Sequence, residues 1–184
     1  PVMPFDAAPD AAPASFEAFL ASVERRGFRL AELSLGHRED ALDVVQEAMI
    51  RLVAYRDRPA GEWPPLFWSI LRRQITDRHR RNLVRRKVMT VLGRSEEIRE
   101  DPLEMLPDPN EDPARRHADG AAWQALGRAV RALPRRQREA YLLRELQGLD
   151  VAATAAAMGC SEGSVKTHLS RAMSALRNHL EEWR

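Results

Sequence analysis

Several features that would indicate particular functions are scarce in this 184-residue chain. It has one cysteine, Cys160, so no internal disulfide and no cysteine-rich metal site can form, which fits a reducing cytoplasm. Its five histidines show no metal-ligand spacing. No apolar run approaches the roughly 20 residues that span a bilayer, and the N-terminal stretch lacks the features of a signal peptide. These absences favour a cytoplasmic protein without a metal or other cofactor.

Strand-forming patterns are scarce as well. β-Branched runs of alternating polarity are missing, whereas apolar residues recur at helical spacing along most of the chain. The net charge is only +2, but basic residues dominate from 72 to 94 and acidic residues from 96 to 119. We therefore expect an all-α protein whose surfaces of opposite charge serve different partners.

The helical pattern is interrupted once by a long stretch rich in acids and prolines. We expect residues 88–119 to be a flexible acidic linker between two small helical domains, 15–87 and 120–184. Residues 1–14, rich in Pro, Ala and Asp, are expected to be a disordered lead-in.

Capping residues and prolines predict where the helices begin and end. In the first domain, helices are predicted from Ser15 to Gly36, over 37–55, and from Pro64 past Arg81. In the second domain, the predicted helix boundaries are Pro134, Gly148, Asp150, Gly159 and Ser161.

The last two predicted helices have the spacing of a helix-turn-helix. In the longer one, at 100° per residue, the arc opposite the apolar residues carries small polar groups and cations but no acid. A helix that enters the DNA major groove needs such a face. The candidate contacts to duplex DNA are Ser161, Lys166, Thr167, His168, Ser170 and Arg171. The alternative is a solvated face, and for His168 a position at the edge of the core.

One arc of the helix predicted over 37–55 carries acidic and amide side chains together with an isoleucine. Its residues are Asp43, Gln46, Glu47 and Ile50. A polar stripe that includes an exposed apolar side chain indicates a protein partner, and an ordinary solvated face is the alternative.

Basic and aromatic residues are interleaved in the third helix and the loop before it. Cations can follow a phosphate backbone while rings stack on unpaired bases, so this pattern suits single-stranded DNA. The candidate residues are Trp63, Trp68, Arg72, Arg73, Thr76 and Arg80. Trp63, expected in the loop, is the better stacking candidate, whereas Phe67 is expected in the core and Trp68 has a core position as its alternative.

Both halves of the chain resemble bacterial RNA polymerase sigma factors of the sigma-70 family. "GLDVAATAAAMGCSEGSVKTHLSRAMSAL" resembles the domain that reads the promoter −35 element. "LDVVQEAMIRL" resembles the helix that docks on the clamp of the polymerase largest subunit, and "LFWSILRRQITDRHRR" the segment that recognises and melts the −10 element. The resemblance covers about 16–87 and 120–182, with no extra domain between them, as in the extracytoplasmic-function group.

Some positions match the family's pattern and others depart from it. The matches are Asp43, Gln46 and Glu47 in the docking stretch and Asp77 in the melting stretch. The departures are Leu42 for a usual acid, Leu66 for a usual Trp and Arg73 for a usual Asn. The departures at Leu66 and Arg73 are compatible with the fold and bear on the base preference.

The resemblance implies a non-enzymatic subunit that binds core RNA polymerase through clamp and flap. It would direct promoter-specific transcription initiation, read −10 and −35 elements and assist strand opening, with an anti-sigma factor as a further candidate partner. The alternative is a stand-alone helix-turn-helix activator with a helical regulatory domain, because "SVKTHLSR" also resembles the output domains of response regulators. A nuclease would need paired carboxylates near the basic surface, where Asp77 is the only acid within the basic helix.

Overall fold

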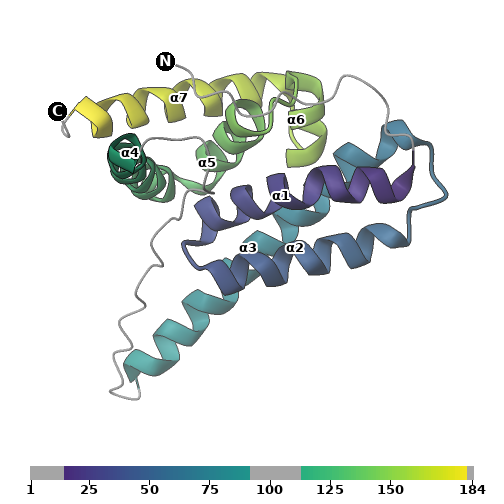
Figure 1. Cartoon of the computed structure of the whole chain (residues 1–184), viewed down its shortest axis with the longest axis horizontal. Helices are drawn as coiled ribbons and strands as arrows, with labels where there is room; N and C mark the ends of the chain where they lie inside the picture. The colour runs from purple at the N-terminus through teal and green to yellow at the C-terminus, as the bar shows by residue number, and fades with distance from the viewer. Residues whose placement is uncertain (1–14, 92–112, 182–184) are drawn as a thin grey trace.

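The computed structural model describes residues 15–91 and 113–181, and every regular element in these two stretches is a helix (Figure 1). The all-α prediction is therefore confirmed for the described part of the chain. The predicted lead-in, 1–14, and residues 92–112 of the predicted linker lie outside it. None of the described helices is both long and apolar enough to cross a membrane.

The first half, residues 15–91, begins with the helices that the capping signals predict. Its elements are α1 (Phe16–Leu35), α2 (Arg38–Val53), the 3₁₀ turn η1 (Ala60–Glu62) and α3 (Trp63–Val91). The Ser15 hydroxyl accepts a hydrogen bond from the Ala18 backbone N–H at 3.1 Å, which satisfies a free donor of the first turn. Gly36 ends α1 in the left-handed conformation, with φ of 74°.

These helices form a small bundle in which α1 and α2 lie side by side and the first part of α3 packs against both (Figure 1). Phe67 and Leu71 of α3 are fully buried. A Cβ at Gly27 would lie 2.9 Å from Phe67 Cζ, so the absence of a side chain lets α3 approach α1 closely. The C-terminal part of α3 extends away from the bundle (Figure 1).

The second half, residues 113–181, ends in the predicted helix-turn-helix. Its elements are α4 (Pro113–Ala132), α5 (Arg135–Tyr141), the π-helical turn η2 (Leu142–Leu146), α6 (Val151–Met158) and α7 (Glu162–Glu181). Asp150 caps α6 by accepting from the Ala153 N–H at 2.6 Å, and Gly159 ends it at φ of 62°. Ser161 caps α7 by accepting from the Ser164 N–H at 3.2 Å.

The predicted linker is wrong at both ends, because residues 88–91 belong to α3 and residues 113–119 to α4. No proline or glycine lies in the α3 sequence after Pro65, so nothing stops the helix at residue 87. Pro113 opens α4 rather than preventing it, since the first residues of a helix have no intrahelical partner for their N–H groups.

The two halves pack against each other, which the sequence did not lead us to expect. α6 lies against α3 and α4 against α1. The buried apolar residues of both halves form one connected cluster, to which Trp68 and Ile75 contribute from the first half and Leu142 and Leu143 from the second.

Candidate nucleic-acid interface

The predicted duplex-binding face of α7 is exposed. Val165, Ala172 and Leu176 are buried against the rest of the second half, so the opposite arc of the helix faces outward. The exposed residues are Ser161, Lys166, Thr167, Ser170 and Arg171, whereas His168 is half-buried. The structure thus brings the candidates together on one face, with His168 at its edge.

Two hydroxyls of this face are already engaged with the α7 backbone. Ser161 Oγ caps the helix and lies 2.9 Å from Ser164 Oγ, and Thr167 Oγ1 donates to the Gly163 carbonyl at 2.9 Å. Both side chains are therefore held short and close to the helix. Lys166 and Arg171 are the long, exposed cations that can reach beyond it.

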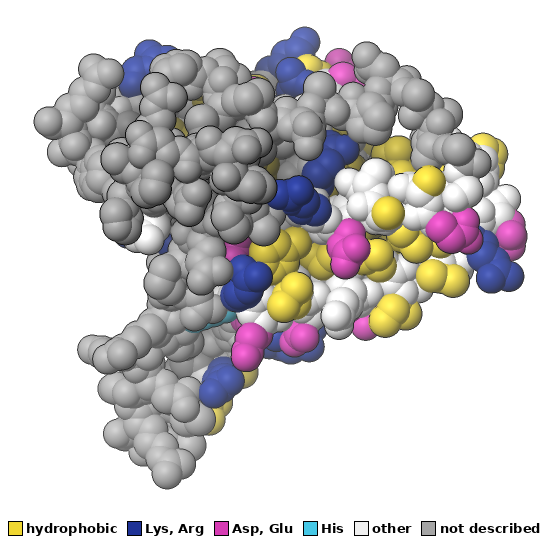
Figure 2. Space-filling view, in the orientation of Figure 1, with side chains coloured by type: hydrophobic (Ala, Val, Ile, Leu, Met, Phe, Trp, Pro, Cys, Tyr) yellow, Lys and Arg dark blue, Asp and Glu magenta, His cyan; other side chains and the backbone are white. Residues whose placement is uncertain are grey.

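The stripe predicted on α2 is open to solvent at its centre. Gln46 is exposed and Ile50 is 67% exposed, an unusual degree for an isoleucine. Asp43 keeps a largely exposed carboxylate that accepts from Arg78 Nη2 at 3.1 Å, and Glu47 pairs with Arg51 at 2.7 Å. Figure 2 shows hydrophobic and acidic side chains intermingled on the surface over α1 and α2.

Neighbouring apolar side chains enlarge this surface. Leu42 and Val53 are also exposed on α2. An apolar residue at position 42, where an acid is usual in the resembled family, thus extends the exposed apolar area beside Asp43. The arrangement suits a partner surface that is partly apolar and partly basic.

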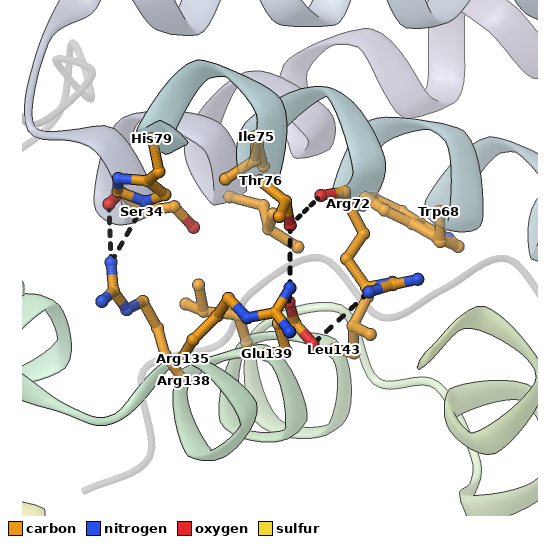
Figure 3. A pocket seen from close by; sticks show the side chains of 12 residues that line it. Ser34, Trp68, Arg72, Ile75, Thr76, His79, Arg135, Arg138, Glu139 and Leu143 are labelled. Carbon is orange, nitrogen blue, oxygen red and sulfur yellow. Dashed lines mark hydrogen bonds and ion pairs between the residues drawn. The ribbon is translucent and has the colours of Figure 1, made fainter. Parts of the chain in front are cut away.

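Of the six residues predicted to bind single-stranded DNA, some are exposed in the fold and others are covered. Arg73 and Arg80 are exposed on α3. Trp68 is only 2% exposed, and Arg72 and Thr76 face α5 and α6 of the second half (Figure 3). The predicted basic surface is therefore open on one side and covered on the other.

The placement of Trp63 in the loop is wrong. Trp63 is the first residue of α3 and is 7% exposed. Its ring packs against Phe16, at a centroid distance of 5.2 Å, and against Phe19, at 5.9 Å. Both contacts come from within the first half, so Trp63 is a core residue and we omit it from the DNA surface.

Three arginines that the sequence did not single out together hold the two halves in contact. Arg26 Nη2 donates to the Gln147 carbonyl at 2.6 Å, Arg72 Nε to the Ala157 carbonyl at 2.9 Å, and Arg138 Nη1 to the Ser34 carbonyl at 3.0 Å. We call these three side chains and their acceptors the arginine clasp. Figure 3 shows Arg138 reaching Ser34 and Arg72 beside Glu139, its ion-pair partner at 3.6 Å.

Burial affects all three clasp arginines. Desolvation lowers the pKa of Arg26, Arg72 and Arg138, and for Arg72 the Glu139 carboxylate opposes that effect. The guanidinium groups stay charged at neutral pH, because an arginine pKa lies far above it. Each therefore carries a desolvation cost that its hydrogen bonds must offset.

The described residues offer little for metal or thiol chemistry. Within 15–91 and 113–181, no three His, Cys, Asp or Glu side chains are grouped so that they could hold a metal ion. Cys160 is a half-buried free thiol in the turn before α7, as its position in the sequence indicated.

Family models match both halves of the chain. Residues 15–86 match the model described as sigma-70 region 2, and residues 123–176 match sigma-70 region 4. The first range contains the α2 stripe and the basic part of α3, and the second contains the arc of α7.

The similarity to known proteins extends over most of the chain. An RNA polymerase sigma-E factor of Streptomyces antibioticus is 34% identical over 77% of this chain and 71% of its own length. A sigma-E factor of Streptomyces avermitilis is 30% identical over 90% and 85%. The ECF RNA polymerase sigma factor SigM of Mycobacterium tuberculosis is 30% identical over 88% and 75%.

A solved structure shares the fold. It is the sigma factor RpoE of Bartonella quintana, crystallised in complex with the anti-sigma factor NepR. The TM-score is 0.68 at 23% sequence identity, and the alignment covers 92% of this chain and 98% of that one.

Proposed function

The chain belongs to the extracytoplasmic-function group of the sigma-70 family, and we propose which of its surfaces makes each contact of a sigma factor. As a member of that family, it binds core RNA polymerase and directs promoter-specific transcription initiation. The residues that carry each contact are the subject of the proposal.

The outward face of α7 reads the upstream, −35 element of the promoter as duplex DNA. Arg171 is placed to donate to a guanine edge, and Lys166, at the flank, to a phosphate. Thr167 and Ser170 are small, so they allow the helix to lie deep in the major groove. His168 and Ser161 lie at the edge of the face and at its N-terminal end, where backbone N–H groups favour a phosphate.

The basic side of α3 holds the melted downstream element. Arg73 and Arg80 are exposed and can track the backbone of a single strand. Trp68, Arg72 and Thr76 complete this surface when the second half moves off α3. Trp63 has no place in it, because it belongs to the core of the first half.

The α2 stripe docks on the clamp of the polymerase largest subunit. Asp43, Gln46 and Glu47 supply acceptors for basic groups, and Ile50 supplies an apolar anchor with most of its surface available for burial. The second half binds the polymerase flap, as the resemblance implies. An anti-sigma factor remains a candidate partner, since the related Bartonella sigma factor was crystallised with one.

The protein performs no catalytic step of its own in this proposal. The polymerase supplies the chemistry, and the sigma factor supplies position and strand separation. It works in the cytoplasm, where bacterial polymerase and promoter DNA are found.

The single observation that carries the proposal is the exposed stripe centred on Gln46 and Ile50, on the same helix stretch that resembles the docking helix. A stand-alone activator would not need it. The test is transcription in vitro with purified core polymerase on a promoter library. Asp43→Arg combined with Gln46→Ala should reduce specific transcription and polymerase binding by at least about tenfold.

The matched control is Glu24→Arg, which reverses an exposed charge on the neighbouring helix α1. The fold should survive the double substitution, because Arg78 keeps its 2.6 Å ion pair with Asp40. Wild-type co-purification of the double variant with polymerase would show that the stripe is merely solvated.

A further inference from the structure

A cavity lies between α3 of the first half and α5 and η2 of the second, in the closed arrangement in which the two halves are packed together (Figure 3). Its volume is about 420 Å³, counted out to the mouth where it meets solvent. Voids between well-packed helices are usually no larger than a water molecule, whereas partly enclosed pockets of this kind are typical of small-molecule sites. The space is therefore sufficient for a compact ligand.

Part of the cavity wall is apolar. It is formed by Leu30, Trp68, Ile75, Leu142 and Leu143. Trp68, Leu142 and Leu143 are each at most 2% exposed, so packing on their other sides holds them in place. Such a wall favours a ligand with an apolar body, because the burial of apolar surface is favourable whatever its orientation.

The charged groups of the cavity carry an excess of positive charge. Arg72, Arg135 and Arg138 line it, and Glu139 is the one acid among the described lining residues. The Glu139 carboxylate lies 3.6 Å from Arg72 Nη1 and from Arg135 Nη1, and it accepts from Arg136 Nη1 at 3.4 Å. One carboxylate thus faces three guanidinium groups, and the surplus charge attracts a second anion.

Two of the lining arginines are poorly solvated. Desolvation lowers the pKa of Arg72 and of Arg138, and the charges of neighbouring arginines act in the same direction, opposed by Glu139. Both guanidinium groups therefore carry a desolvation cost in the closed arrangement. An anion bound beside them would offset part of it.

Unused donors accompany this charge. Arg72 Nε donates to the Ala157 carbonyl at 2.9 Å, and Arg135 Nη1 donates to Thr76 Oγ1 at 3.4 Å. Nη2 of Arg72 and Nη2 of Arg135 make no hydrogen bond to a residue in 15–91 or 113–181. Arg138 Nε is also buried without a partner among those residues. The two Nη2 groups are therefore available to a pair of ligand oxygens.

We propose that this cavity binds a small organic carboxylate, which consists of one carboxylate group on a compact apolar body. The carboxylate accepts from Arg72 and Arg135, and the body lies against Ile75, Leu142 and Leu143. A phosphate fits less well, because its additional oxygens would face the apolar wall without donors. The inference does not rest on the assignment of α3 to DNA. Because both halves line the site, the ligand binds the closed arrangement and stabilises it by mass action.

The first measurement is nuclear magnetic resonance of the full ¹⁵N-labelled chain during titration with benzoate. The indole N–H resonance of Trp68, identified by its loss in Trp68→Phe, should shift and saturate. The Kd should be about 1 mM or lower, as expected for a ligand of this size. The resonance of Trp123, which does not line the cavity, should shift far less. Absence of a saturable shift at Trp68 up to about 20 mM benzoate would overturn the proposal.

Three further probes separate the parts of the ligand. Benzyl alcohol keeps the ring without the charge, acetate keeps the charge with almost no apolar body, and inorganic phosphate offers a different anion. Each should bind at least about tenfold more weakly than benzoate, because each lacks one of the two matched features. If acetate or phosphate binds as tightly as benzoate, the cavity is only a general anion site. Equal binding of benzyl alcohol would show that the arginines take no part. Either result contradicts the proposed ligand class.

A substitution at Arg135 tests the donor. Its side chain is 46% exposed, so Arg135→Gln should fold, and it should weaken benzoate binding by about tenfold. Arg128→Gln is the matched control, because Arg128 is an exposed arginine of α4 that does not line the cavity, and its affinity should equal that of wild type. Equal losses in the two variants would mean that net charge alone attracts benzoate, which would overturn the site. The probe series on wild type decides the question without any variant, should Arg135→Gln prove unstable.

Discussion

Both the outward face of α7 and the covered face of α3 were predicted to bind DNA, but the first is exposed in the structure and the second is buried. Lys166, Ser170 and Arg171 on α7 are exposed, whereas Trp68 and Arg72 on α3 are covered by the second half. Helical periodicity tells which side of a helix faces away from its own bundle. It does not tell whether another domain lies on that side.

Trp63 and Trp68 were both predicted to contact single-stranded DNA, and these two residues also differ in what surrounds them. Trp63 packs against Phe16 and Phe19, which belong to its own bundle. Trp68 contacts Phe67 of its own helix, lies under the Arg26 guanidinium, and lines the pocket between the two halves. We therefore expect that separating the halves would uncover more of Trp68 than of Trp63.

The largest effect should come from Trp63→Ala. Removing a buried tryptophan from a packed core costs about 3–5 kcal/mol of folding free energy. Urea unfolding followed by circular dichroism would measure that loss, and Trp63→Phe, which keeps a ring between Phe16 and Phe19, should recover most of it. A variant of wild-type stability with a selective defect in promoter opening would restore Trp63 to the DNA surface.

Ser170→Glu should have the next largest effect, because it tests the open face. A carboxylate placed against the groove would repel phosphates and replace a small side chain, so binding to a −35 duplex should fall by at least about 100-fold. Selection of duplexes from a randomised library by the intact protein would measure it.

Asn178→Glu, two turns further along the same helix and exposed, is the matched control and should cost little. Equal losses for the two variants would mean that net charge, rather than contact at Ser170, governs the binding.

Local signals explain what could be predicted from the sequence. Ser15, Asp150 and Ser161 each cap a helix through a hydrogen bond that spans three residues, and Gly36 and Gly159 end helices by their own conformation. Such features depend on neighbouring residues alone. The arc of α7 was predictable for the same reason, since it needs only the helical repeat.

The remaining features depend on residues that are distant in the sequence. Arg26 and Gln147 are separated by 121 positions, and neither belongs to a recognisable motif. When an arginine donates to a main-chain carbonyl, the acceptor can be any residue type, because every residue has a carbonyl. Such a contact therefore cannot be predicted from the sequence. Trp63 was misplaced because Pro64 and Pro65 indicated a helix start just after it, while the helix begins at Trp63 itself.

The smallest predicted effect concerns two neighbouring arginines of α3, one exposed and one covered. Arg73 is exposed, whereas its neighbour Arg72 bonds to Ala157 and pairs with Glu139 in the clasp. In the free protein, Arg73→Ala should weaken binding of a short oligothymidylate by roughly threefold to tenfold, the loss of one charge-assisted phosphate contact. Arg72→Ala loses a similar contact but also loosens the clasp, and the two effects should nearly cancel. In the proposed function the halves are apart in the complex with polymerase, so there the cancellation should disappear, and both variants should reduce permanganate-detected promoter opening to a similar extent. Fluorescence anisotropy on the free protein and footprinting on the polymerase complex provide the two readings.

Equal losses for Arg72→Ala and Arg73→Ala in the free protein would mean that α3 is as accessible at Arg72 as it is at Arg73, and that the closed arrangement does not restrain it in solution.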